Sequence, residues 1–258
     1  MSMADQLPPP GGTEQPLLAH LIELRSRLLS ALAGVALVFA PLAFYARQLY
    51  HWLAEPLMNL LPKGSSMIAT EVASPFFAPF KLAGLLAFVV ALPWVLYQLW
   101  AFVAPGLYKN ERKLVMPLLI SSTLLFYAGV AFAYFLVLPR IFVFLLGVTP
   151  EGVSVMTDIS KYLDFVLKLF MAFGLAFETP VAIVLLCWTG FVTPDQLRKR
   201  RDYVLVGVFV LAAVLTPPDI ISQISLAVST YGLYEVGILW ASWLVRQRAK
   251  PEDAAADS

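Results

Sequence analysis

The chain contains 258 residues, of which 60% are hydrophobic and 14% are charged. A composition this apolar excludes a water-soluble domain and predicts a polytopic membrane protein. The formal net charge of +1 says little about partners, and we expect no nucleic-acid partner. The single cysteine excludes an internal disulfide, and two histidines leave no cluster with metal-ligand spacing, so we expect no metal and no cofactor.

The N-terminal region combines a tail with an amphipathic segment. Residues 1–16 contain Pro8-Pro9-Pro10-Gly11-Gly12 and predict a disordered tail. A helix should follow, because polar residues at spacings of three and four share one face while leucines share the other. The polar residues are His20, Glu23, Arg27 and Ser30, and the leucines are Leu17, Leu18, Leu21 and Leu28. This pattern predicts an interfacial helix, and the late start of the long apolar run argues against a cleavable signal peptide.

Six apolar segments are predicted to span the bilayer, whose ~30 Å core requires about 20 helical residues. They cover residues 28–46, 76–103, 115–137, 162–188, 204–215 and 220–244. Prolines should divide the loop at 47–75 into short helical turns, and a polar stretch is expected at 139–161. The fifth segment would give only ~18 Å of helix, and Asp219 is placed to cap the sixth helix.

An even number of spans puts both ends of the chain on one side of the membrane. Twelve of the 18 lysines and arginines fall in the N-terminal segment, the loop at 109–113, the turn at 198–201 and the C-terminal tail. An excess of basic residues marks the cytoplasmic side, so both termini are expected in the cytoplasm. The predicted organisation is one six-helix membrane domain at 17–245 between disordered cytoplasmic tails at 1–16 and 246–258.

Glu178 is a carboxylic acid within the apolar run from Leu169 to Trp188. An ionisable side chain inside a membrane span indicates a functional site by default. A structural carboxyl group is the alternative, because Pro180 frees the nearby carbonyl of Ala176. Lys168 lies ten residues away, or ~15 Å along a helix, and is no obvious partner.

Two further acidic residues, Glu23 and Glu111, are expected on the cytoplasmic side. Together they could accept guanidinium groups, because the planar fork of arginine binds a carboxylate through two hydrogen bonds whereas lysine is a point charge. Phe102, Leu107 and Tyr108 could provide an apolar shelf beside them. The alternatives are an ordinary pair between Glu23 and Arg27, a solvated loop charge at Glu111, and aromatic residues that anchor the membrane interface.

The sequence contains no H-E-x-x-H motif, nucleophile elbow or phosphate-binding loop, so an enzyme is not expected. A transporter remains an alternative function, because the sequence contains a weak internal repeat and parallel repeats occur in transporters. Thr70-Glu71-Val72 with Lys81 and Pro93 recurs 87 residues later as Thr157-Asp158-Ile159 with Lys168 and Pro180. Glu178 would then be the proton site of a proton-coupled transporter of a small solute. Against this stands the lack of a second intramembrane acid or base within its obvious reach.

Several motifs in the same order resemble the TatC family, the multispanning receptor subunit of the twin-arginine protein translocase. The resemblance covers nearly the whole chain, and only the two tails depart from it. The motifs are His20-Leu21-Ile22-Glu23-Leu24-Arg25, Met67-Ile68-Ala69-Thr70, Ser74-Pro75-Phe76-Phe77, Trp100 to Pro105, Leu107-Tyr108-Lys109 with Glu111-Arg112, Phe126 to Phe135, Met171 to Gly174 with Phe177-Glu178, and Leu215-Thr216-Pro217-Pro218-Asp219.

The resemblance implies an all-α, cup-shaped receptor with six transmembrane helices, of which the fifth and sixth are short, in the bacterial cytoplasmic (inner) membrane. Such a receptor would bind the twin-arginine signal peptides of folded precursor proteins. It would assemble with itself and with the single-span partners TatA and TatB, and the complex would use the proton-motive force for export.

The resemblance also implies roles for individual residues. The signal-peptide site would comprise Glu23, Arg25, Phe102, Tyr108, Lys109 and Glu111. Glu178 would be a polar point in the concave membrane face, and Thr216 and Gln223 would mark a partner-docking edge on helices five and six. Pro56 and Phe76 would fall in the first exposed loop.

Overall fold

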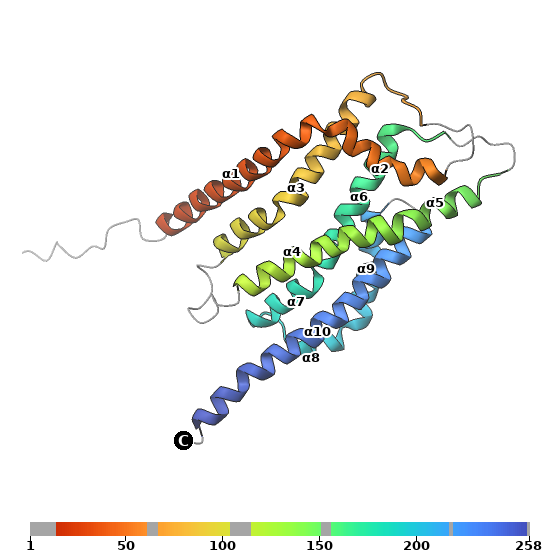
Figure 1. Ribbon diagram of the computed structural model, residues 1–258. Helices are drawn as coiled ribbons and strands as arrows, with labels where there is room; N and C mark the ends of the chain where they lie inside the picture. Colours follow the sequence, from red (N-terminus) through yellow and green to blue (C-terminus); the bar gives the residue numbers. More distant parts are fainter. Residues whose placement is uncertain (1–13, 61–66, 104–114, 151–155, 217–218, 257–258) are drawn as a thin grey trace, which may run out of the picture.

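The computed structural model describes residues 14–60, 67–103, 115–150, 156–216 and 219–256. Every regular element in these ranges is a helix, apart from one isolated bridge between two loops. The all-α class implied by the family resemblance is therefore confirmed for the described residues. Figure 1 shows the start of α1 and the end of α10 at the same end of the molecule.

The helices follow one another with few long connections. Their bounds are α1 Glu14–Phe44, α2 Ala46–Leu60, α3 Ser74–Val103, α4 Val115–Phe132, the π-helix η3 Ala133–Val137, α5 Leu138–Gly147, α6 Ile159–Phe177, α7 Thr179–Trp188, α8 Pro194–Lys199, α9 Arg201–Leu215 and α10 Ile220–Ala256. Both α1 and α10 extend beyond the range expected for the membrane domain.

Within the described residues, five segments are long and apolar enough to cross a membrane. They are Leu21–Phe44, Ser74–Phe102, Met116–Gly147, Ile159–Trp188 and Ile220–Val245. Five of the six predicted spans thus have a counterpart of full length. The remaining one corresponds to α9, whose 15 residues give about 22 Å of helix.

The region after the first span differs from the prediction, because α2 is one continuous helix that contains Pro56. A proline in a helix interior costs about 3 kcal/mol. Tyr50, Leu53 and Ala54 all lie on the buried side of α2, and burial of each large apolar side chain contributes about 1.5–3 kcal/mol. Tertiary packing therefore outweighs the proline. The expected loop position was also wrong for Phe76, which lies in the first turn of α3.

The third span continues through α5 to Gly147, so the polar stretch expected at 139–161 was wrong over its first part. The π-helical turn η3 immediately precedes Pro139. A π turn changes the backbone hydrogen-bond spacing, which allows a proline to be accommodated without ending the helix. The guanidinium Nη1 of Arg140 also donates to the carbonyl of Leu136 at 2.7 Å. The π turn thus keeps the helix continuous through Pro139, where the sequence predicted that it would end.

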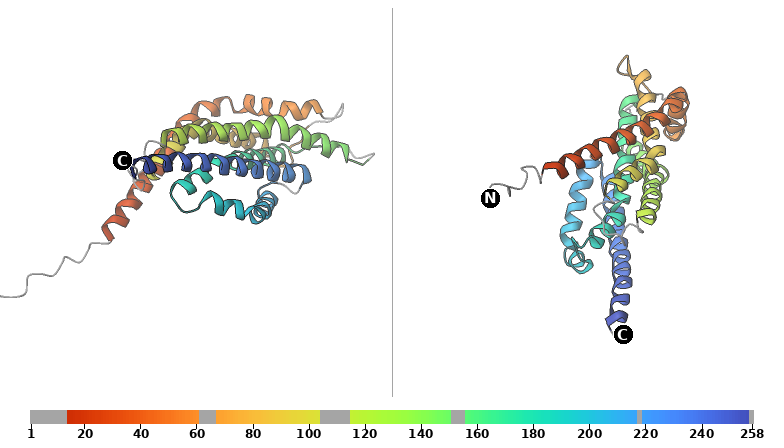
Figure 2. Two further views of the ribbon diagram at one scale, coloured as in Figure 1. Left: turned by 90° about the horizontal axis from the view of Figure 1, so that it is seen from below. Right: turned by 90° about the vertical axis from the view of Figure 1, so that its left-hand side faces the viewer.

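Glycines allow several helices to approach closely. A Cβ atom on Gly129 of α4 would lie 2.5 Å from the carbonyl oxygen of Phe173 on α6, and one on Gly237 of α10 would lie 2.9 Å from the Cα of Pro180 on α7. These contacts align α4 with α6 and α7 with α10. In contrast, α1 packs mainly against α3, and its first turns project away from the other helices (Figure 2).

Two loops at the opposite end of the molecule are joined through Asp158. Its carboxylate accepts hydrogen bonds from the N–H and the hydroxyl of Thr70, at 2.9 and 2.7 Å, and from the N–H groups of Ser160 and Lys161 at the start of α6. A parallel bridge between Ile68 and Asp158 continues this connection. The Lys161 N–H and the Thr70 hydroxyl, in that order, hold the pKa of the Asp158 carboxyl at about 2, below its ordinary 3.8.

Candidate functional site

The first candidate site lies where the N-terminal half of α1 crosses the C-terminal half of α3. Arg27 of α1 lies between two acceptors, with Nη2 3.5 Å from Glu23 Oε1 and Nη1 3.3 Å from the amide oxygen of Gln98 on α3. Glu23 and Arg27 each keep 36% of the side chain exposed. The carboxylate of Glu23 is therefore positioned by its own helix but still open to a ligand.

Arg27 of α1 points toward α3, and Leu21 and Ile22 point away from it. Leu21 and Ile22 are 58% and 68% exposed, whereas Gln98 opposite Arg27 is buried. This arrangement suits a membrane span, because lipid replaces water outside and polar groups find partners inside the protein. The part of α1 that is long and apolar enough to cross a membrane runs from Leu21 to Phe44, so it begins before the expected Leu28.

An apolar groove of about 170 Å³ lies beside Glu23, between α1 and α3. Leu24 and Leu28 of α1 face Leu99 and Phe102 of α3 across it, and the stem of Arg27 forms part of its wall. Phe102 thus lines the same groove as Arg27, the residue that contacts Glu23. A carboxylate next to such a groove can bind a cationic group while adjacent apolar atoms of the same ligand are buried.

Of the other residues predicted for the signal-peptide site, the structure describes Arg25 but not Tyr108, Lys109 or Glu111. The side chain that Glu23 meets is Arg27 rather than Arg25, because residues four apart share a helix face, and Arg25 is exposed. Tyr108, Lys109 and Glu111 lie outside the described residues. Sequence reasoning missed Gln98, although an amide within an apolar span is itself a signal of a polar contact.

The second candidate site surrounds Glu178, at the break between α6 and α7. The buried hydroxyl of Ser122 on α4 donates to Glu178 Oε2 at 2.6 Å. Glu178 Oε1 is buried and has no hydrogen-bond partner among the described residues. The hydroxyl of Thr179 donates to the carbonyl of Ala176 at 2.6 Å, which satisfies the acceptor freed by Pro180. Ser122, 56 residues away, was not predicted because only the fold brings it near.

Replacing Ser122 by alanine is expected to destabilise the protein by about 0.6–2 kcal/mol, because it removes an interhelical hydrogen bond to Glu178. In a Glu178→Leu background, the same replacement should have almost no effect. Thermal unfolding of the two single variants and the double variant measures this coupling. An equal loss in both backgrounds would show that the Ser122 hydroxyl does not stabilise the fold through Glu178.

The third candidate region lies around α9 and the start of α10. Gln223 borders a shallow groove of about 410 Å³, together with apolar residues of α9 such as Val206, Phe209 and Val210. Thr216, predicted at a docking edge, is buried, and its hydroxyl donates to the carbonyl of Ala212 at 2.8 Å. Asp219 caps α10 by accepting from the N–H and the hydroxyl of Ser222.

Comparison with known proteins gives one consistent result. The family described as Sec-independent protein translocase protein (TatC) matches residues 19–228. The chain is 55% identical over 239 residues to the TatC protein of Escherichia coli K12, covering 93% of each chain. It is 54% identical over 249 residues to the TatC protein of Azotobacter chroococcum mcd 1, covering 96% of each. A crystal structure described as the twin arginine translocase receptor TatC superposes with a TM-score of 0.75 at 35% identity, covering 87% of this chain and 98% of that one.

Proposed function

This chain belongs to the TatC family of Sec-independent protein translocase proteins, and on that premise we propose that it is the receptor and core subunit of a twin-arginine translocase. It binds the twin-arginine signal peptides of folded precursor proteins at the cytoplasmic face of the inner membrane. It is a transport component rather than an enzyme.

The observation that carries this proposal is the half-exposed carboxylate of Glu23 beside the apolar groove between α1 and α3. An arginine side chain can bind this carboxylate bidentately while apolar residues of the same peptide contact Leu99 and Phe102. Glu111 supplies the second carboxylate for the arginine pair, with Arg25, Tyr108 and Lys109 around it.

The topology belongs to the same proposal. α9 is the fifth of six spans, and its short length is compensated by packing against α10 or by local thinning of the bilayer. Both termini then lie in the cytoplasm, as the distribution of basic residues favours.

Assembly with single-span partners of the TatA and TatB type involves two membrane surfaces. One is the groove along α9 that Gln223 borders, next to the partner-docking edge proposed for Thr216. The other surrounds the Glu178 carboxyl, whose Oε1 can accept a hydrogen bond from a partner helix. Self-association completes the receptor complex, and the proton-motive force drives export at the level of that complex.

The alternative of a solute transporter gains no support, because the hydrogen-bond partner of Glu178 in the described residues is the hydroxyl of Ser122 rather than an ionisable group.

The test is binding of a twin-arginine signal peptide to the purified full-length protein, compared with the same peptide carrying two lysines. The wild type should prefer the arginine peptide at least tenfold, because only guanidinium binds a carboxylate bidentately. Glu111→Gln should lose this preference, whereas Glu71→Gln, which changes an exposed carboxylate in the α2–α3 connection, should retain it. Equal binding of the two peptides to the wild type would contradict the proposed receptor site.

A further inference from the structure

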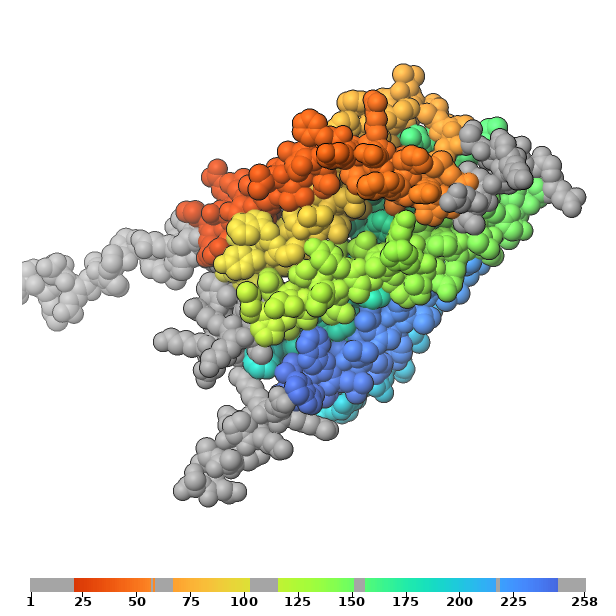
Figure 3. Space-filling model, in the orientation of Figure 1, coloured from red at the N-terminus to blue at the C-terminus, as the bar shows by residue number. Residues whose placement is uncertain are grey.

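A second cavity, unrelated to the proposed peptide site, opens on the side of the helix bundle. It has a volume of about 370 Å³ and lies between α2, α3 and the α4–η3 segment. Figure 3 shows the hollow between the orange and yellow of α2 and α3 and the green of α4, with teal atoms of α6 behind them. Its walls are almost entirely apolar, including Leu49 of α2, Leu86 and Val89 of α3, and Phe170 of α6.

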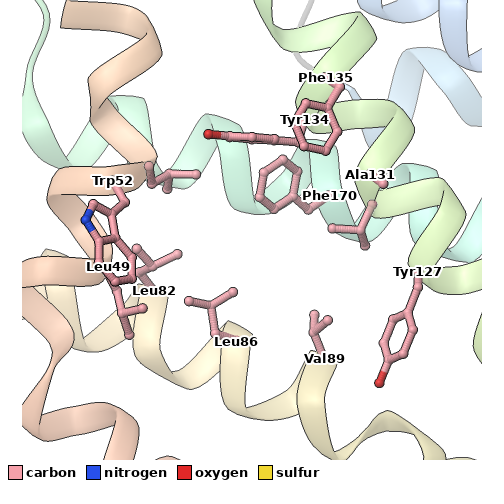
Figure 4. Close-up of a pocket in the computed structure, with 12 residues that line it drawn as sticks. Leu49, Trp52, Leu82, Leu86, Val89, Tyr127, Ala131, Tyr134, Phe135 and Phe170 are labelled. Atoms are coloured by element: carbon pink, nitrogen blue, oxygen red, sulfur yellow. The ribbon is translucent and has the colours of Figure 1, made fainter.

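The few polar atoms at this cavity belong to aromatic side chains. Figure 4 shows the hydroxyl of Tyr134 directed across the cavity toward α2, and the hydroxyl of Tyr127 at the other end. Trp52 lies at the α2 side and is 61% exposed. Tryptophan and tyrosine favour the boundary between the hydrocarbon and the headgroups of a bilayer.

Helix α2 has the character of an interfacial helix. Its buried side carries Tyr50 and Leu53, whereas Arg47 and His51 are exposed. A helix with one buried apolar side and exposed basic residues on the other is typical of the headgroup level of a bilayer. The α2 side of the cavity is therefore at headgroup level, and the remainder extends between α3 and α4 into the membrane-spanning part of the bundle.

The lining of the cavity indicates the class of its occupant. The walls are almost entirely apolar, and the Tyr134 hydroxyl is directed toward α2, so the occupant should be apolar along most of its length and polar where it reaches α2. A single hydrocarbon chain that carries a lipid headgroup has this character and is thin and flexible enough to enter the cavity.

We propose that this cavity binds one acyl chain of a membrane phospholipid whose headgroup lies at α2. The chain fills the space between Leu86, Val89 and Phe170. Arg47 is exposed on the same helix as the lining residue Leu49, at the end of the cavity where the headgroup would lie, and the Tyr134 hydroxyl can donate to an ester oxygen. A bound chain would keep the helices around this opening at a fixed separation.

The test is native mass spectrometry of the full-length protein extracted from vesicles of phosphatidylethanolamine and phosphatidylglycerol. The wild type should retain one phospholipid. Ala131→Trp, which places an indole in the cavity from α4, should reduce the lipid-bound fraction at least fivefold. Its matched control is Ala128→Trp, an exposed position on the same helix outside the cavity. Val89→Phe and Val90→Phe form a second pair on α3, where Val89 lines the cavity and Val90 is exposed beside it.

A labelling experiment on the wild type gives a result even if the filling variants do not fold. A phospholipid with a diazirine in its acyl chain should label the cavity segments of α3 and α4 at least fivefold more than the exposed face of α9. Excess unlabelled phospholipid should compete for this labelling. The proposal is overturned if the wild type retains no phospholipid, if each filling variant retains as much as its control, or if labelling is uniform over the exposed helices.

Discussion

Replacing Gly129 by alanine is expected to destabilise the protein by about 1–3 kcal/mol, because the added methyl group overpacks the contact between α4 and α6. The new Cβ would lie 2.5 Å from the carbonyl oxygen of Phe173, which is backbone and cannot rotate away. The two helices must therefore separate. Thermal unfolding of the purified protein should show the midpoint lowered by roughly 2–12 °C.

The matched control is Gly84→Ala on α3, where no atom lies within 4 Å of the added Cβ. Alanine favours a helix over glycine by up to about 1 kcal/mol, so this variant should be neutral or slightly stabilised. If both replacements lowered the midpoint equally, close packing at Gly129 would not be the cause.

Glu23→Gln and Arg27→Gln are expected to change the affinity for a twin-arginine signal peptide in opposite directions. Glu23→Gln removes the charge that binds a peptide arginine, and the loss of about 1.5–3 kcal/mol weakens binding roughly 10- to 100-fold. Arg27→Gln removes the cation that competes for the same carboxylate at 3.5 Å. An exposed pair of this kind is worth about 0.2–1 kcal/mol, so affinity should rise up to about fivefold.

Titration of a labelled peptide against the two variants and the double variant measures both effects. The double variant restores the net charge of the wild type, so it separates a specific carboxylate from a general electrostatic attraction. It should bind as weakly as Glu23→Gln alone. Wild-type affinity in the double variant would indicate that only net charge matters at this surface.

The limits of the spans were predictable where apolar residues run without interruption. Residues 76–103 were expected to form a span, and α3 covers Ser74–Val103 even though it contains two prolines. The predictions at Pro56 and Pro139 were wrong. Whether a proline ends a helix depends on tertiary packing and local backbone geometry, which the sequence alone does not show. At Pro56 the burial of α2 keeps the helix intact, and at Pro139 the π turn does so.

Single charged residues in the candidate sites were visible in the sequence, but their partners were not. Glu178 was conspicuous as an acid within an apolar run, whereas Ser122 is an ordinary hydroxyl residue until α4 packs on α6. The same holds for Gln98 opposite Arg27, 71 residues apart.

The hydrogen bonds between Thr70 and Asp158 link residues 88 positions apart, and this separation affects how the protein is made. A ribosome that adds about 5–20 residues per second needs roughly 4–18 s to proceed from the first residue to the second. During that interval the segment around Thr70 has been synthesised but its carboxylate acceptor has not. The connection between α2 and α3 can therefore reach its final form only after the start of α6 has been synthesised, which makes it one of the late steps in the biogenesis of the chain.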